Sequence, residues 1–302
     1  FFNHQTYQVV SDGTAEENTD YYVSDYTKLT DLVSAEAAYA EEVQAEGAVL
    51  LQNPNQVLPI DKNLNITLLG MGCATENFLY GGGGSGSIDT SKTPSLKDVF
   101  EEKGYTVNPT MWNFYHVGEG FGYKRNVGEG AVSEVPVSAY GTEEKESFTE
   151  YRDAAIVVIG LSGSEGYDLP LFTAEDPSKH ILELSQDQLD LIDMAEENFE
   201  KVVILLNTMG PIELEPIENR NLACVWIGGG GQNGLSAIPD LLNGDRYPSG
   251  RNVDTYAYDA LSAPAMVNFG DYTFTNMPES LELADKYLFY QEGIYIGYKY
   301  YE

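Results

Sequence analysis

The chain has 302 residues, of which 42% are hydrophobic, and a formal net charge of −32. This length and composition suffice for one large globular core, and no apolar run is long enough to span a membrane. Only 16 Lys and Arg residues are present. They are too few to cluster against phosphates, so neither nucleic acid nor an anionic membrane is expected as a partner.

The start of the chain bears on its location, whereas its two cysteines do not define a redox compartment. No charged segment followed by an apolar one opens the sequence, which favours the cytoplasm, although secretion stays open because Phe1 need not be the natural start. Cys73 and Cys224 lie in or after apolar runs, so we expect two buried free thiols. The three histidines have no metal-ligand spacing, and we expect no metal site.

The first predicted element is a helix over residues 27–44. Apolar side chains recur there at helical spacing, for example Leu29, Leu32 and Val33. Asp25 or Thr27 is expected to cap its N-terminus.

Strands and helices then alternate along the chain. Short apolar runs predict strands at residues 66–69, 105–107, 154–159, 202–206 and 223–227. Helices are predicted at residues 95–103, 143–151, 186–199 and 235–242. In the helix at 186–199, Ser185 and Gln188 are placed as a capping box, and Leu189, Ile192 and Ala195 share a core-facing side. The alternation predicts a doubly wound, mainly parallel α/β fold.

Two segments depart from this alternation. Residues 109–141 are rich in glycine and aromatic residues and carry Glu119, Glu129 and Glu134; a loop of that length is usually functional or disordered. After residue 246 the chain becomes irregular and tyrosine-rich, as in a segment that wraps another surface. We therefore expect an N-terminal extension at 1–26, an α/β domain at 27–255 and an irregular C-terminal segment at 256–302.

A single carboxyl stands in the glycine-rich loop that follows the run at 154–159. This run is continuous and β-branched, which is typical of a strand buried on both faces of a parallel sheet. Such sheets bind ligands outside the carboxyl ends of their strands. The loop places Glu165 between Gly163 and Gly166, and partial burial there would raise its pKa, as a general acid requires. The alternative is an ordinary solvated carboxylate.

Three nucleotide or hydrolase motifs nearly fit and fail. The string GMGCAT at 70–75 lacks the last small residue of the dinucleotide-binding pattern. The glycine run GGGGSGS at 81–87 is not a phosphate-binding loop, because Lys92 and Thr93 follow Ser91 where such a loop has glycine. The string GLSGS at 160–164 fails the nucleophile-elbow pattern at its fifth position. No cofactor is therefore expected.

Seven groups of residues, in order, resemble the second domain of the glycoside hydrolase family 3 β-glycosidases, a six-stranded α/β sandwich. They are EGAVLLQN at 46–53 with LPI at 58–60, GGGGSGS at 81–87, SGSEGYD at 162–168, LSQDQLDLI at 184–192, GGGGQNG at 228–234, LNGD with PSGR at 242–251, and YQEGIYIGYKYY at 290–301. The resemblance implies that residues 46–53 form that domain's opening helix and turn, and that residues 66–70 form its first strand. It also implies that Glu165 is the acid/base and that Asp168 contacts the sugar. The glycine run would admit a sugar, with Ser85, Gly86 and Ser87 as its contacts; a purely structural turn is the alternative that stays open.

The sequence differs from the family pattern in two respects. Leu169 and Pro170 follow Asp168, where the family usually has an arginine. The family also carries its nucleophile, an Asp in a motif resembling VSDW, on a (β/α)8 barrel. Residues 23–26 read VSDY, but no repeated strand and helix units surround Asp25 to form a barrel. The resemblance therefore implies a barrel domain as partner, in cis or on a separate chain. Some bacterial members have the two domains in reversed order.

The function implied is that of the acid/base domain of a retaining β-glycosidase, similar to β-glucosidases, acting on terminal β-linked sugars. Such enzymes hold two carboxyl groups about 5–5.5 Å apart. With only one of them, the chain alone is expected to be inactive. The alternative is a catalytically silent carbohydrate-binding or assembly module, which would have no reason to keep Glu165. The expected partners are a carbohydrate and the barrel, and a homo-oligomer stays open.

Overall fold

The computed structural model describes residues 25–81, 88–123, 134–161, 163, 169–173, 176–268, 270, 272–276 and 286–301. Within them, no helix has the length and apolar character needed to cross a membrane. Backbone contacts divide the chain into two units, residues 1–39 and 40–302. Helix α2 (Leu29–Gly47) begins in the first unit and ends in the second. It begins after Lys28, so the prediction that Asp25 or Thr27 caps it is wrong.

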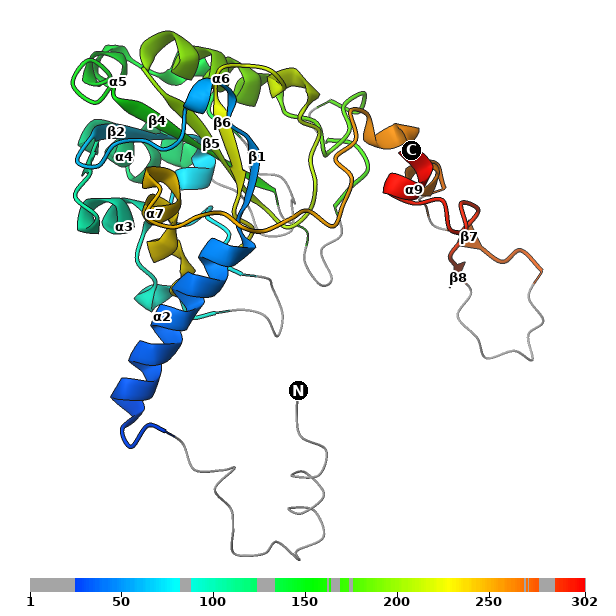
Figure 1. Ribbon diagram of the computed structural model, residues 1–302. Helices are drawn as coiled ribbons and strands as arrows, with labels where there is room; N and C mark the ends of the chain where they lie inside the picture. The colour runs from blue at the N-terminus through cyan, green and yellow to red at the C-terminus, as the bar shows by residue number, and fades with distance from the viewer. Residues whose placement is uncertain are drawn as a thin grey trace, which may run out of the picture. The chain divides into compact units, whose positions relative to one another are not determined.

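A six-stranded sheet forms the centre of the second unit (Figure 1). Its order is β1-β6-β5-β4-β2-β3. The strands are β1 (Val49–Gln52), β2 (Asn65–Leu69), β3 (Thr106–Val107), β4 (Ala154–Leu161), β5 (Val202–Thr208) and β6 (Ala223–Trp226). All neighbouring pairs are parallel except β1 with β6. The predicted mainly parallel, six-stranded α/β sandwich is thus confirmed.

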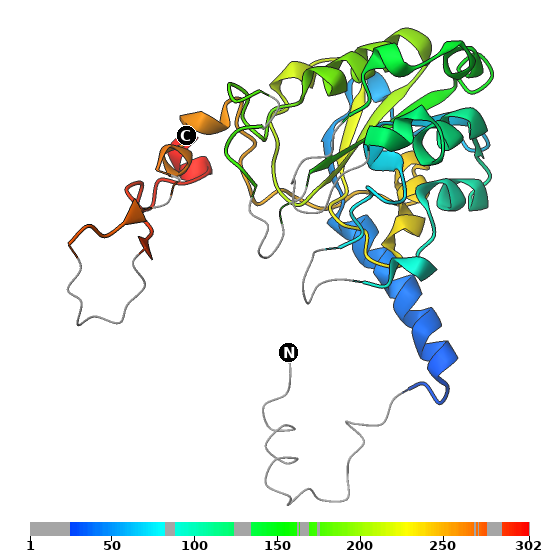
Figure 2. The same cartoon turned by 180° about the vertical axis from the view of Figure 1, so that it is seen from behind.

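Helices cover both faces of this sheet. Figures 1 and 2 show α3 and α7 on one face and α5 and α6 on the other. The helices are α3 (Leu96–Glu102), α4 (Pro109–His116), α5 (Thr142–Ser147), α6 (Gln186–Asn198), α7 (Ile238–Asn243), α8 (Pro264–Val267) and α9 (Tyr298–Tyr301). Every residue of β4 and β5 is buried, as the continuous apolar runs predicted. The sheet is covered on both faces because parallel strands need crossover helices.

The capping box of α6 is confirmed. The Ser185 hydroxyl accepts a hydrogen bond from the Gln188 amide, and the Gln188 side chain accepts one from the Ser185 amide. Ile192 and Ala195 are fully buried, and Leu189 packs against the core. Here the local sequence alone determined where the helix begins.

The helix and turn predicted at residues 46–53 are wrong, because residues 49–52 of this segment form strand β1. Residues 46–53 were expected to form the opening helix and its turn, but α2 ends at Gly47 and residues 49–52 form an edge strand. Val49 pairs with Trp226 and Leu50 with Val225. The run of apolar residues continues the helical pattern, and only pairing with β6, far away in the sequence, selects the extended conformation.

The predicted excursion at residues 109–141 is partly regular structure. Asn108 caps α4, accepting hydrogen bonds from the amides of Thr110 and Met111. Met111 and Tyr115 are fully buried, so part of the segment expected as a functional or disordered loop belongs to the core. Residues 124–133, which include Glu129, lie outside the described residues.

The C-terminal segment is largely irregular, as expected, with short elements. It contains α8, α9 and a two-stranded antiparallel ribbon of β7 (Tyr272–Thr273) and β8 (Lys286–Tyr287). Short stretches of 3-10 helix also occur in the chain, among them η3 (Met71–Cys73) and η9 (Gly234–Ala237). The helix predicted at 235–242 is split into η9 and α7. Cys73 and Cys224 are buried free thiols, as predicted.

Candidate active site

The predicted site residues Glu165, Asp168, Ser85, Gly86 and Ser87 all lie outside the described residues. The structure does describe the chain on either side of both loops that carry them. One loop follows β4 and the other follows β2, and these strands are parallel neighbours. Since the carboxyl ends of parallel strands lie at one edge, both loops leave the same edge of the sheet.

Asn207, near the end of β5, joins the segments that follow β2 and β6. Its side chain is fully buried. The Oδ1 atom accepts a hydrogen bond from the Leu79 amide at 2.6 Å, and Nδ2 donates to the Leu79 carbonyl at 3.0 Å. Nδ2 also donates to the Gly228 carbonyl at 2.6 Å. One amide therefore satisfies three buried backbone groups and fixes the approach to the glycine loop.

Both ends of the glycine loop are hydrogen bonded to the segment after β6. Before the loop, the Tyr80 carbonyl accepts from the Gly231 amide at 2.5 Å. After it, the Asp89 carbonyl accepts from the Gln232 side chain at 3.3 Å. Gly231 has φ of 60° and lies in the left-handed region that glycine tolerates best. The glycines at 228–231 thus let this segment turn close to Tyr80 and Asp89, the bonded residues before and after the loop.

The loop that contains Glu165 begins at the end of β4. Leu161 pairs with Thr208 of β5, and the Leu161 carbonyl accepts a hydrogen bond from the Met209 amide at 3.2 Å. The Thr208 carbonyl in turn accepts from the indole N–H of Trp226 at 2.9 Å. The start of the loop is therefore bonded across the central strands.

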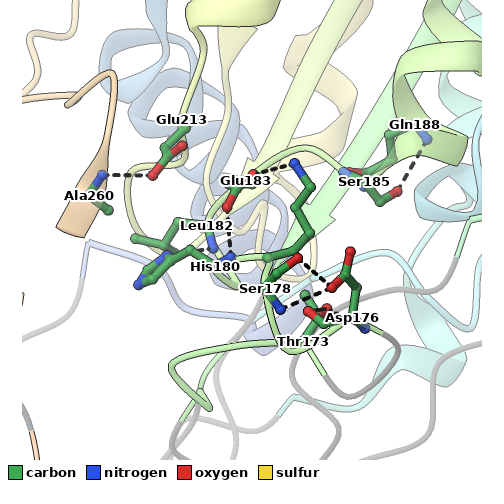
Figure 3. Close-up of polar contacts among 11 residues, drawn as sticks. Thr173, Asp176, Ser178, His180, Leu182, Glu183, Ser185, Gln188, Glu213 and Ala260 are labelled. Carbon is green, nitrogen blue, oxygen red and sulfur yellow. Dashed lines mark hydrogen bonds and ion pairs between the residues drawn. The ribbon is translucent and has the colours of Figure 1, made fainter.

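The same loop returns through a hairpin whose described residues are 171–173 and 176–181. The Thr173 amide donates to the Lys179 carbonyl at 2.9 Å, and the Ile181 amide donates to the Leu171 carbonyl at 3.1 Å. Figure 3 shows the polar contacts at its two ends. At the tip, the Asp176 carboxylate accepts from the amide and the hydroxyl of Ser178.

The base of the hairpin is held by carboxylates. The Glu183 carboxylate accepts from the His180 amide at 2.7 Å and pairs with Lys179 at 3.0 Å, and these contacts lower its pKa despite burial. Glu213 accepts from the Ala260 amide at 2.7 Å, which joins this region to the C-terminal segment (Figure 3). Burial raises the pKa of Glu213.

His180 is buried beside these carboxylates, with 2% of its surface exposed. Its Nδ1 accepts a hydrogen bond from the Leu182 amide at 3.2 Å, so the proton of the neutral ring is on Nε2. Burial lowers its pKa and keeps the ring neutral. This histidine supports the hairpin, where Phe172 and His180 form an antiparallel bridge.

Glu134, close to the carboxyl end of β2, is a buried carboxyl with a raised pKa. It is 7% exposed and accepts hydrogen bonds from the amides of Met71 and Val135. Burial raises its pKa to about 8, so at neutral pH it is mostly protonated. A raised pKa suits a general acid, but this carboxyl is enclosed, and its contacts hold the η3 turn in place.

Two tyrosines lie beside Glu134 and complete this buried polar cluster. The Tyr115 hydroxyl accepts from the Gly70 amide at 2.8 Å and is hydrogen bonded to the Tyr140 hydroxyl. Burial raises the pKa of both hydroxyls well above the usual value. Gly72, in η3, lies so close to β4 that a Cβ atom there would be 2.5 Å from the Val158 carbonyl oxygen. The turn after β2 is therefore tightly packed.

A groove of about 330 Å³ lies elsewhere, lined by Gln52, Cys224 and Tyr256 among others. Gln52 pairs with Cys224 at the start of β6. This is the amino edge of the parallel strands, opposite to the two loops, so the groove is no part of the candidate site.

The sequence analysis did not identify the two polar side chains that organise the carboxyl edge of the sheet, Asn207 and Glu134. Asn207 directly follows the apolar run 202–206, and a polar residue at such a strand end was a signal that could have been used. Glu134 was noted as one of the acids of the excursion, but nothing local indicated its burial. Gln232 follows β6 at the carboxyl edge, and its side chain donates a hydrogen bond to the Asp89 carbonyl.

The chain is similar to known proteins over most of its length. A model described as the Glycosyl hydrolase family 3 C-terminal domain matches residues 48–298. Beta-glucosidase A of Butyrivibrio fibrisolvens is 27% identical over 286 residues, which cover 86% of this chain and 32% of that protein. The beta-glucosidase of Ruminococcus albus is 29% identical over 276 residues, or 87% of this chain and 26% of that protein.

Solved structures agree with the sequence matches. The structure of beta-glucosidase 3B from Thermotoga neapolitana in complex with glucose superposes with a TM-score of 0.70 at 26% identity, covering 89% of this chain and 36% of that one. The chain thus spans about a quarter to a third of the relatives it matches. With a match over 48–298 and the expected sheet, the chain belongs to glycoside hydrolase family 3, as its C-terminal domain.

Proposed function

We propose that the chain is the acid/base-bearing domain of a retaining β-glycosidase that hydrolyses terminal β-linked sugars, with Glu165 as the acid/base. The main support is the arrangement of the sheet edge. The loops that contain Glu165 and the glycine run follow neighbouring parallel strands. Asn207 and the segment 228–232 are hydrogen bonded to residues on either side of the glycine loop. A carboxyl and a glycine-rich backbone at one such edge suit sugar binding and proton transfer.

The proposed chemistry needs a second carboxylate from a barrel domain. In a retaining enzyme the nucleophile attacks the anomeric carbon while the acid protonates the leaving oxygen, and the same carboxyl then activates water. Glu165 would carry out both proton transfers, and Ser85, Gly86, Ser87 and Asp168 would contact the sugar. Leu169 and Pro170 follow Asp168, where the family usually has an arginine, so no sugar contact by that arginine is proposed.

The 302-residue chain alone should not hydrolyse aryl β-glucosides, because an acid without a nucleophile cannot form the glycosyl-enzyme. The measurement compares the purified chain with its Glu165→Gln variant. Turnover by the unmodified chain above that control would contradict the division of the site between two domains.

The role of Glu165 is tested in the complete gene product with substrates of different leaving group. Loss of a general acid costs about 10²- to 10⁴-fold only where the leaving oxygen needs a proton. Glu165→Ala should therefore nearly abolish disaccharide hydrolysis, spare the first step with dinitrophenyl glycosides, and respond to azide, which attacks the covalent intermediate unaided.

Glu119→Ala is the matched control, since it removes another glutamate from the same domain and should show no dependence on the leaving group. Equal losses for all leaving groups in Glu165→Ala, without rescue by azide, would indicate that Glu165 only binds sugar or supports the loop. The acid would then have to be sought in the segment at residues 109–141.

A further inference from the structure

The two-stranded ribbon of the C-terminal segment presents one aromatic face. Tyr272 and Tyr287 are directly opposite each other in the antiparallel pair, with ring centroids 5.5 Å apart. Phe274 lies 4.7 Å from Tyr287, and Phe289 lies 6.0 Å from Tyr272. Because side chains alternate along a strand, these four residues share one side of the ribbon. We call them the aromatic face.

This face is open to solvent in the described part of the chain. Phe274 is 47% exposed and Phe289 is 50% exposed. Other apolar side chains of the same segment are exposed as well, among them Leu288, Tyr290, Ile294 and Tyr295. A lone two-stranded ribbon is at best marginally stable in water unless its apolar face is covered. A dense exposed apolar patch of this kind marks an interaction surface.

The segment is nonetheless folded. The Tyr272 hydroxyl donates to the Asn268 carbonyl at 2.9 Å, and the Asn268 side chain donates to Glu292 at 3.5 Å. Farther along, the hydroxyls of Ser262 and Tyr301 are hydrogen bonded at 2.9 Å. These bonds fix the segment against residues 262–268 and give the aromatic face a definite shape.

Charge distinguishes two possible partners of the aromatic face, another folded domain and a second copy of this chain. Residues 272–276 and 286–301 contain only Lys286, Glu292 and Lys299 as charged side chains, in a chain of net charge −32. The patch therefore does not repel a partner. Two copies of the whole chain, however, repel each other strongly, which disfavours a second copy.

We propose that the aromatic face is the docking surface for another folded domain of a longer polypeptide that contains this chain. The relatives support an occupant of this kind, because the chain spans only 26% to 36% of their length. Such a domain has to offer an apolar patch that packs against the four rings. Its identification as the barrel domain rests on the proposed function.

Hydroxyl-radical footprinting with mass spectrometry tests this on the 302-residue chain and on the complete gene product. Phe274 and Phe289 should be labelled strongly in the chain, and several-fold less in the complete protein. Sedimentation should show the chain as a monomer. Equal labelling in both, or a gene product without a further domain, would overturn the proposal. A dimeric chain with protected phenylalanines would overturn it as well, in favour of a second copy.

Variants of the complete protein give a second readout. Phe274→Ser with Phe289→Ser should expose the remaining tyrosines of the face and make the protein more open in small-angle scattering. Val117→Ser is the control, because Val117 is 81% exposed but stands outside the ribbon. An unchanged scattering profile in the double variant would count against docking. Neither readout uses turnover, so the two proposals can fail separately. Protection of the aromatic face without leaving-group dependence in Glu165→Ala would refute the acid/base role alone. Leaving-group dependence without protection of the aromatic face would refute docking alone.

Discussion

Replacing Asn207 by alanine should destabilise the domain far more than the loss of one surface amide. The side chain is fully buried and satisfies the amide and carbonyl of Leu79 and the carbonyl of Gly228. Each buried group left without a partner costs about 1–3 kcal/mol, so with partial relaxation by water we expect a loss of about 3–5 kcal/mol. The loops after β2 and β6 should loosen together, because one amide joins them.

The assay is urea unfolding of the 302-residue chain, with hydrogen exchange of the Leu79 amide as a local probe. Asn113→Ala is the matched control, since Asn113 is exposed on α4, and it should change the free energy of unfolding by less than about 0.5 kcal/mol. A loss below about 1 kcal/mol for Asn207→Ala, or unchanged exchange at Leu79, would refute the reasoning that this amide holds the sheet edge together.

Two further changes test the buried cluster after β2. Because burial raises the pKa of Glu134 from 4.5 to about 8, the folded state binds its proton more tightly than the unfolded state. The contribution of Glu134 is therefore present below about pH 4.5 and is lost as the pH rises through about 8, by up to roughly 4–5 kcal/mol. Urea unfolding at several pH values should show that the free energy of unfolding of Glu134→Gln falls less between about pH 4.5 and 8 than that of the unmodified chain. Parallel pH dependences of the two proteins would contradict this. Gly72→Ala should cost about 1–3 kcal/mol in thermal unfolding through the clash with the Val158 carbonyl, whereas Gly122→Ala, with open space around it, should not; equal midpoints would show that η3 can move away.

Local signals predicted the elements that depend on local physics. The capping box at Ser185 and the continuous apolar run of β4 were both read correctly, because a cap and a fully buried strand are visible within a few residues. Strand β1 was missed, because its conformation depends on pairing with β6, about 170 residues later. The aromatic residues of α4 were misread as a loop, because their burial depends on contacts that the sequence does not show.

The sequence by itself determined the α/β alternation, the family resemblance and the choice of Glu165 as the candidate acid. Only the tertiary structure decided which residues hold that edge of the sheet. Asn207 bonds to Leu79 across 128 positions, and Glu134 bonds to Met71 across 63, so no local pattern contains either contact. The raised pKa of Glu134 and the exposure of the aromatic face likewise depend on which segments pack together, because packing decides which side chains are buried.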